Sequence, residues 1–196
     1  LVDTIDKTQP FETFSDLLDG GLASRSPNRP EALDHLETTL VQVVEEQMLS
    51  DVPLGCFLSG GVDSSLIASL MQSRSVQPIR TFAIGFSEAR FNEAPHAAAV
   101  ARHLGTDHTE FTLSEQDALG VIPDLPEIYD EPFADSSQIP TVLLCREARK
   151  AVTVALTGDG GDEVFGGYNR HVIGPKLLSK MQRVPRGLRR SGGCHV

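Results

Sequence analysis

The segment Ser59-Gly-Gly-Val-Asp-Ser-Ser65 constrains the fold of this chain more than any other feature. It follows a short apolar run, residues 53–58, and precedes a stretch in which apolar residues recur at helical spacing. A strand that runs into a tight glycine turn and then a helix is typical of α/β proteins, whose ligands bind beyond the carboxyl ends of parallel strands. The segment therefore predicts an α/β fold with a ligand site at this turn.

The rest of the chain continues the alternation of strands and helices. Strands are predicted at 53–58, 79–86, 108–113 and 151–157, and helices at 31–50, 93–104 and 141–150, with a further helix capped by Ser114. Residues 124–140 are rich in proline and acidic residues and are predicted to be mainly loop. Strands that alternate with helices indicate a parallel sheet with crossover connections.

Charge and composition exclude several classes of function. The net charge is −10, which opposes general binding to nucleic acids. Residues 176–196 carry six basic residues and no acidic ones. We interpret them as a helix separated from the rest of its domain rather than as a nucleic-acid site. No apolar run is long enough for a membrane span, and three widely spaced cysteines favour a reduced cytoplasmic setting. Residues 1–10 show no signal pattern and no initiator Met, so a piece of a longer chain is expected.

The residues of the first turn suit a phosphate group. Gly60 and Gly61 let backbone N–H groups approach an anion, and the following helix adds a partial positive charge. Asp63 would repel phosphate unless a cation lies between them, so it predicts Mg²⁺. The turn matches neither GxxxxGK[ST] nor GxGxxG, and an ordinary capped glycine turn is the alternative.

A second glycine turn, Thr157-Gly-Asp-Gly-Gly-Asp162, follows the strand predicted at 151–157. Two turns of this kind at neighbouring strand ends would bring Asp63 and Asp162 near one cation. A calcium loop is the alternative, although the EF-hand pattern of acids is not met.

Both turns carry a family resemblance. The first resembles the SGGxDS loop of the N-type ATP pyrophosphatases (PP-loop enzymes). The second, continued by Glu163-Val-Phe-Gly-Gly-Tyr168, resembles the SGEGSDE…GGY signature of the glutamine-dependent asparagine synthetases, whose relatives include the β-lactam synthetases. Residues 48–55 and 130–137 resemble the same family. The resemblance implies an adenine nucleotide α-hydrolase-like fold with about four parallel strands present, incomplete at the C-terminus.

The resemblance also implies an activity and a set of site residues. The enzyme would adenylate the side-chain carboxylate of aspartate, release pyrophosphate, and let ammonia form asparagine and AMP. ATP and Mg²⁺ are the implied cofactors, and Asp159, where the asparagine synthetases usually carry Glu and the β-lactam synthetases Tyr, is the implied catalytic residue. The implied pyrophosphate-binding residues are Ser59, Gly60, Gly61, Asp63, Ser64 and Ser65, the adenosine-lining residues are Phe57, Leu58, Ile84, Thr157 and Gly158, and the metal ligands are Asp63 and Asp162.

The implied organisation is a linker over 1–30, a synthetase domain over 31–175 and a truncated basic tail over 176–196. The nucleophilic N-terminal cysteine of the family's glutaminase domain has no counterpart here, so ammonia is expected from a glutaminase domain absent from this chain. A homodimer is left open. A related amidotransferase of polysaccharide or secondary-metabolite biosynthesis, and an inactive nucleotide-binding fragment, are the alternatives.

Three other groups of residues receive plainer interpretations. His96, His103 and His108 are assigned to ordinary helix and strand positions rather than to a metal site. The acids of 124–140 are assigned to a solvated loop near the substrate cleft. Cys56 is assigned to a buried strand rather than to a nucleophile.

Overall fold

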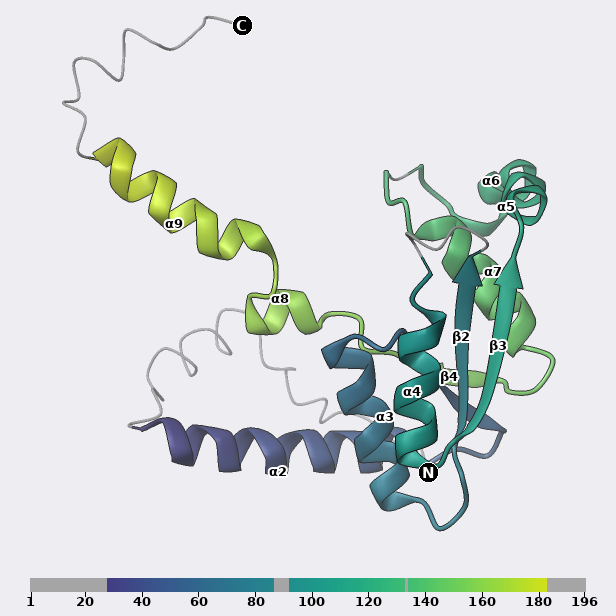
Figure 1. Cartoon of the computed structure of the whole chain (residues 1–196), viewed down its shortest axis with the longest axis horizontal. Helices are drawn as coiled ribbons and strands as arrows, with labels where there is room; N and C mark the ends of the chain where they lie inside the picture. Colours follow the sequence, from purple (N-terminus) through teal and green to yellow (C-terminus); the bar gives the residue numbers. More distant parts are fainter. Residues whose placement is uncertain (1–27, 87–91, 133, 183–196) are drawn as a thin grey trace, which may run out of the picture. The chain divides into compact units, whose positions relative to one another are not determined.

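The computed structural model, which describes residues 28–86, 92–132 and 134–182, contains a sheet of four parallel strands (Figure 1). The strands are β1 (Leu54–Phe57), β2 (Arg80–Phe86), β3 (Asp107–Leu113) and β4 (Val154–Leu156). Their order across the sheet is β3-β2-β1-β4, and every pairing is parallel. The prediction of an α/β fold with four parallel strands flanked by helices is confirmed.

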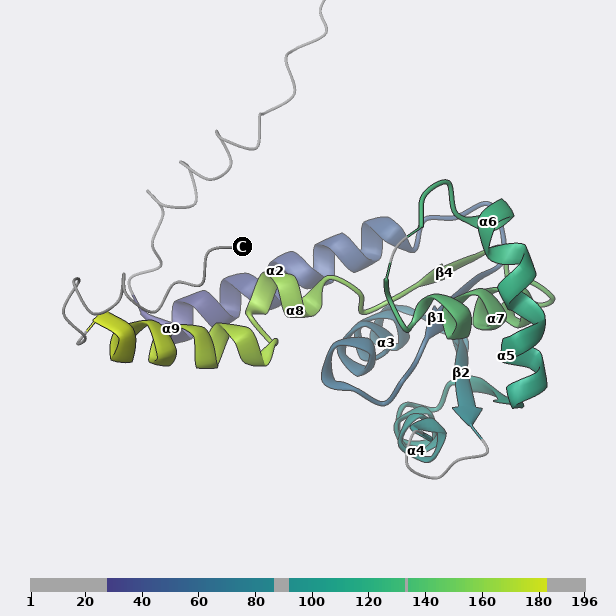
Figure 2. The ribbon, with the colours of Figure 1, turned by 90° about the horizontal axis from the view of Figure 1, so that it is seen from above.

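Helices connect the strands in the predicted alternation. The connecting helices are α3 (Val62–Arg74), α4 (Ala94–Leu104), α5 (Glu115–Val121), η1 (Ile122–Asp124), α6 (Leu125–Ile128) and α7 (Gln138–Ala148). Two further helices, α8 (Gly161–Phe165) and α9 (Asn169–Gln182), follow β4 (Figure 2). Ser114 caps α5 as predicted. Residues 129–132 and 134–137 are non-helical, as predicted for much of 124–140, but α6 and the end of η1 occupy 124–128. Pro123 and Pro126 lie in the first turns of η1 and α6, where proline sacrifices no hydrogen bond.

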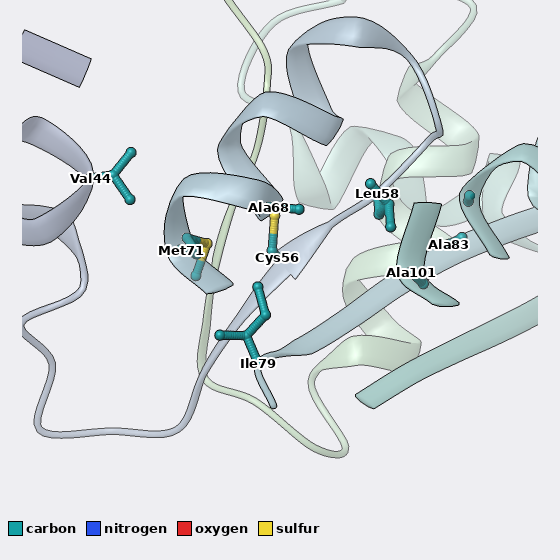
Figure 3. Packing of buried hydrophobic residues seen from close by; sticks show 9 residues of the cluster. Val44, Cys56, Leu58, Ala68, Met71, Ile79, Ala83 and Ala101 are labelled. Atoms are coloured by element: carbon teal, nitrogen blue, oxygen red, sulfur yellow. The ribbon is translucent and has the colours of Figure 1, made fainter. Parts of the chain in front are cut away.

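Different helices cover the two faces of the sheet. Consecutive side chains of each strand point to opposite faces, so neighbouring strand residues pack against different helices. On one face, Cys56 and Ala83 pack in a core with α3 and α4 (Figure 3). On the other face, Phe82 packs with Ala148 of α7 and stacks on Phe111. Burial on both faces explains why the strand sequences at 54–57 and 82–86 are apolar runs rather than alternating patterns.

Helix α2 (Arg29–Gln47) crosses the boundary between two compact units, Leu1–Val43 and Val44–Val196. It begins before the predicted Glu31 because Asn28 Oδ1 accepts a hydrogen bond from the Glu31 N–H (3.0 Å). Val44 is buried in the core of the second unit, whereas Leu33 and Val43 are exposed. Among the described residues, no helix is both long and apolar enough to cross a membrane.

The connections change direction at β1, because β2 lies on one side of this strand and β4 on the other. In open α/β sheets, such a switch point leaves a crevice at the carboxyl ends of the two strands concerned. The two predicted glycine turns follow these strands, β1 and β4. The fold thus brings together two segments about a hundred residues apart in sequence.

Candidate functional site

The first glycine turn leaves β1 and enters α3, and its first glycine, Gly60, is in a constrained position. Gly60 has a φ of 80°, and a β-carbon built on it would lie 2.7 Å from the backbone nitrogen of Ala97 in α4. Within the turn, Ser59 Oγ and Ser64 Oγ are 2.9 Å apart, and the Gly61 N–H donates to Ser59 Oγ (3.2 Å). The turn therefore packs closely against α4 and is held by its own serines.

The N-terminus of α3 offers donors to an anion. Its N-cap residue, Gly61, has no side chain that could accept hydrogen bonds from the first N–H groups of the helix. These groups and the helix dipole favour negative charge at this end. Ser65 Oγ, one turn away, is buried and has no hydrogen-bond partner among the described residues.

The second glycine turn lies directly against the first. A β-carbon on Gly158 would be 2.5 Å from the Ser64 nitrogen, and one on Gly161 would be 2.6 Å from the Asp63 carboxyl carbon. Between them, Gly160 has a φ of 90°. The missing side chains of Gly158 and Gly161 therefore let the Asp63 carboxylate lie next to the backbone that leads into Asp162.

A cleft of about 1040 Å³ opens at the carboxyl ends of β1 and β4. Most of the residues singled out from the sequence line it: Phe57, Leu58, Ser59, Gly61, Asp63, Ser64, Ile84, Thr157, Gly158, Asp159 and Asp162. Gly60 and Ser65 do not, because Gly60 packs on α4 and Ser65 Oγ is buried. Leu58 is 1% exposed and packs in the core, so its side chain offers the cleft almost no surface.

One wall of the cleft was not anticipated from the sequence. It is formed by α7, through residues that include Thr141, Leu144 and Cys145. The sequence predicted a helix there, but which of its faces meets the cleft depends on the order of the strands. A helical pattern alone carries no signal for that order.

The acids of the middle segment separate into two groups. Asp135 lines the cleft, and its Oδ1 accepts hydrogen bonds from the N–H and hydroxyl of Ser137, both 2.8 Å, which hold the pKa of this carboxyl below its ordinary value. Asp124 instead pairs with Arg146 at 2.8 Å on the surface. Of the five acids in 124–140, all of which the structure describes, only Asp135 lines the cleft.

Tyr168 lies just after the second turn and α8, and its side chain contacts Glu163 and Arg170. Its hydroxyl donates to Glu163 Oε1, and the guanidinium carbon of Arg170 lies 4.2 Å from the centre of its ring. This hydrogen bond lowers the pKa of Glu163 and raises that of Tyr168. The side chains of Glu163 and Tyr168 both line the cleft, so their hydrogen bond stabilises the second turn where it borders the candidate site.

The carboxylates of the cleft fit Mg²⁺ bound together with phosphate. Asp63 and Asp162 line the same cleft, one from each turn. In the described part of the chain, no group of three or more His, Cys, Asp or Glu could hold a metal. Mg²⁺ commonly takes one or two carboxylates and completes its shell with phosphate oxygens and water, which this pair allows.

Cys56 is unsuited to nucleophilic chemistry. It is fully buried in β1, and burial raises the pKa of its thiol to about 12. A reactive cysteine needs a stabilised thiolate and access to the substrate. The interpretation of Cys56 as a structural residue agrees with both observations.

The family model of asparagine synthase matches residues 35–192. The chain is 39% identical over 163 residues to the "Putative asparagine synthetase [glutamine-hydrolyzing] 2" of Methanocaldococcus jannaschii, covering 83% of this chain and 31% of that protein. It is 40% identical over 148 residues to "Asparagine synthetase [glutamine-hydrolyzing] 1" of Bacillus subtilis, covering 75% and 23%. The chain thus spans about a quarter to a third of the length of these curated relatives.

Among solved structures, an NMN synthetase from Francisella tularensis matches with a TM-score of 0.49 and 14% identity, over 70% of this chain and 59% of that one. A likeness this weak adds nothing to the assignment of fold or function. The family-model match covers most of the chain, and it includes both glycine turns and the strands that carry them. The chain belongs to the asparagine synthase family.

Proposed function

We propose that this chain forms the synthetase part of an ATP-dependent carbon–nitrogen ligase that converts aspartate to asparagine. Membership of the asparagine synthase family and the names of the relatives support this reaction. The observation that carries the proposal is the contact between the two glycine turns, in which Gly158 and Gly161 lie against Ser64 and Asp63. That contact brings two segments of the sequence together at one cleft, which Asp63 and Asp162 both line.

The first half-reaction is the adenylation of aspartate. A side-chain carboxylate oxygen of aspartate attacks the α-phosphorus of ATP, the bond to the β-phosphate's bridging oxygen breaks, and pyrophosphate leaves. The backbone around Gly61, the hydroxyls of Ser59 and Ser64 and the N-terminus of α3 bind the departing pyrophosphate. Asp63 and Asp162 hold Mg²⁺, which when bound neutralises phosphate charge.

Adenosine lies along the strand ends. Phe57 and Ile84 are half-buried at the carboxyl ends of β1 and β2 and present apolar surface to the base. The backbone of Thr157 and Gly158 borders the ribose side. We assign Leu58 a contact only through its backbone, since its side chain is in the core. Gly60 and Ser65 do not line the cleft, and we assign them to the packing that holds the pyrophosphate-binding turn in shape.

The second half-reaction joins nitrogen to the acyl group. Ammonia attacks the acyl carbon, the bond to the AMP oxygen breaks, and one proton is released. Asp159 is exposed at the cleft, and its N–H donates to Thr157 Oγ1 (3.1 Å), which orients this segment. We assign the Asp159 carboxylate to the handling of the substrate or of this proton.

The ammonia source and the setting belong to the same proposal. Glutamine hydrolysis, named for both relatives, would supply the ammonia through a glutaminase domain outside residues 1–196. The cytoplasm supplies ATP, Mg²⁺ and aspartate together, and we place the protein there. A homodimer is compatible with this arrangement.

Aspartate-dependent exchange of labelled pyrophosphate into ATP tests the proposal. The protein should catalyse exchange with aspartate, and Asp63→Asn should reduce the rate by about a hundredfold or more. Asp107→Asn is the matched control, because Asp107 is an exposed acid at the start of β3 that does not line the cleft. ATP binding without exchange would instead indicate a nucleotide-binding module, and exchange with other carboxylates alone would indicate a related amidotransferase.

A further inference from the structure

The pair Gly166-Gly167 wraps around Asp162 on two sides. The Asp162 carbonyl accepts hydrogen bonds from the N–H groups of both glycines, that of Gly167 at 3.0 Å. A β-carbon built on Gly167 would overlap Asp162 Oδ1 and lie 3.0 Å from the carboxyl carbon. The same turn thus fixes the main chain of Asp162 and borders its carboxylate.

The two glycines are needed for different reasons. Gly166 has a φ of 68°, a conformation that other residues rarely adopt, and its missing β-carbon would be 3.8 Å from the nearest atom, in His171. Gly167 is not among the residues with positive φ, so its backbone conformation suits any amino acid. A side chain at position 167 would therefore have to displace the carboxylate of Asp162, while the Asp162 Cα lies 3.3 Å away.

The residue that follows keeps this turn closed. The Tyr168 hydroxyl donates to Glu163, which lies next to Asp162 in α8. Arg170 covers the Tyr168 ring, with 4.2 Å from its guanidinium carbon to the ring centre. Tyr168 therefore links the end of the turn back to the helix that carries Asp162.

We propose that Gly167 is a positioning residue for Asp162, and that it sets the direction of this carboxylate toward the metal by leaving room for Oδ1. Tyr168 supports the same geometry through Glu163. The inference rests on the proposed function, in which Asp162 holds Mg²⁺. Outer contacts that orient a ligating carboxylate affect metal affinity even though they never touch the metal.

Binding of Mn²⁺ in the presence of α,β-methylene-ATP, followed by electron paramagnetic resonance, tests the inference without turnover. In Gly167→Ala the apparent dissociation constant of Mn²⁺ should rise about tenfold or more. Binding of the same nucleotide in EDTA should change by less than about twofold. Gly174→Ala in α9 is the matched control, because a β-carbon there meets nothing within 4 Å. Asp162→Asn shows how far the apparent dissociation constant of Mn²⁺ rises when a metal ligand is removed.

Each outcome has a separate meaning. Unchanged Mn²⁺ affinity in Gly167→Ala, beside a loss in Asp162→Asn, would overturn the inference and leave the proposed function standing. Absence of nucleotide-dependent Mn²⁺ binding in the wild-type protein would overturn the metal assignment, and the inference with it. If Gly167→Ala does not fold, Tyr168→Phe replaces it, with an expected loss of about threefold in Mn²⁺ affinity; wild-type affinity in that variant would count against the inference.

Discussion

The backbone of Gly158 lies against the backbone of Ser64, so that a β-carbon on Gly158 would be 2.5 Å from the Ser64 nitrogen and 2.8 Å from the Asp63 carbonyl carbon. Backbone atoms at a helix start cannot rotate away as a flexible side chain can. The contact thus couples the end of β4 to the start of α3 with no room for a methyl group.

Replacing this glycine should separate the two turns. In Gly158→Ala, the methyl group must displace either the second turn or the first residues of α3. We expect the dissociation constant for ATP to rise about tenfold, which is ~1.4 kcal/mol, and the free energy of unfolding to fall by about 1–3 kcal/mol. Calorimetric titration with ATP and urea denaturation measure the two effects.

A control in another helix separates this contact from a general effect of alanine. A β-carbon on Gly120 in α5 meets nothing within 4 Å, so Gly120→Ala should retain ATP affinity and gain stability, by about 0.5–1 kcal/mol. If Gly158→Ala bound ATP as tightly as Gly120→Ala does, the coupling of the two turns would not contribute to nucleotide binding.

The parts of the structure that depend on neighbouring residues could be predicted from the sequence. Both glycine turns were recognised because strand, glycines and helix follow one another directly in the chain. The cap of α5 was recognised because Ser114 and Asp117 are three residues apart and bond each other. Such features need no knowledge of the rest of the fold.

The parts that depend on strand order could not be predicted in the same way. Nothing near Gly167 indicates that its missing side chain accommodates Asp162, since its backbone conformation is ordinary. The α7 wall of the cleft, including Thr141, follows from the position of β4 beside β1. The short helices before residue 129 were missed because proline in a first turn is read as a loop signal.

Gly55 in β1 supports a second prediction, about the core rather than the site. A β-carbon there would be 2.7 Å from Phe82 Cε2 and 3.2 Å from Val152 Cγ1, and Phe82 is fully buried. Gly55→Ala should therefore lower the free energy of unfolding by about 1–3 kcal/mol through overpacking. Adding Phe82→Leu should recover part of that loss, measured by urea denaturation; a double variant no better than the sum of the single changes would contradict this packing account.

The cysteines should differ sharply in reactivity. Cys145 is exposed on α7, whereas Cys56 is fully buried with a thiol pKa of about 12. In a Cys194→Ser background, which removes the cysteine outside the described residues, Ellman's reagent should label one thiol in the native protein and a second after unfolding. Cys145→Ser should abolish the native signal. Labelling of Cys56 at the rate of Cys145 would mean that β1 opens readily.

His108 gives the fold a predictable dependence on pH. Its Nδ1 lies 2.9 Å from Thr81 Oγ1, its Nε2 is buried without a partner among the described residues, and burial lowers its pKa, an effect that Glu110 partly opposes. The unfolded chain then binds a proton near the ordinary histidine pKa of about 6.5, while the folded chain resists protonation until lower pH.

The free energy of unfolding should therefore fall as the pH drops below about 6.5, and level off once folded His108 is also protonated. His108→Asn retains a hydrogen-bonding side chain beside Thr81 but cannot titrate, so its stability should depend less steeply on pH between about 6.5 and 5. His103→Asn, at an exposed position of α4, is the matched control and should keep the wild-type slope. Urea denaturation across this pH range measures the slopes, and the same slope in His108→Asn and wild type would assign the pH dependence to other groups.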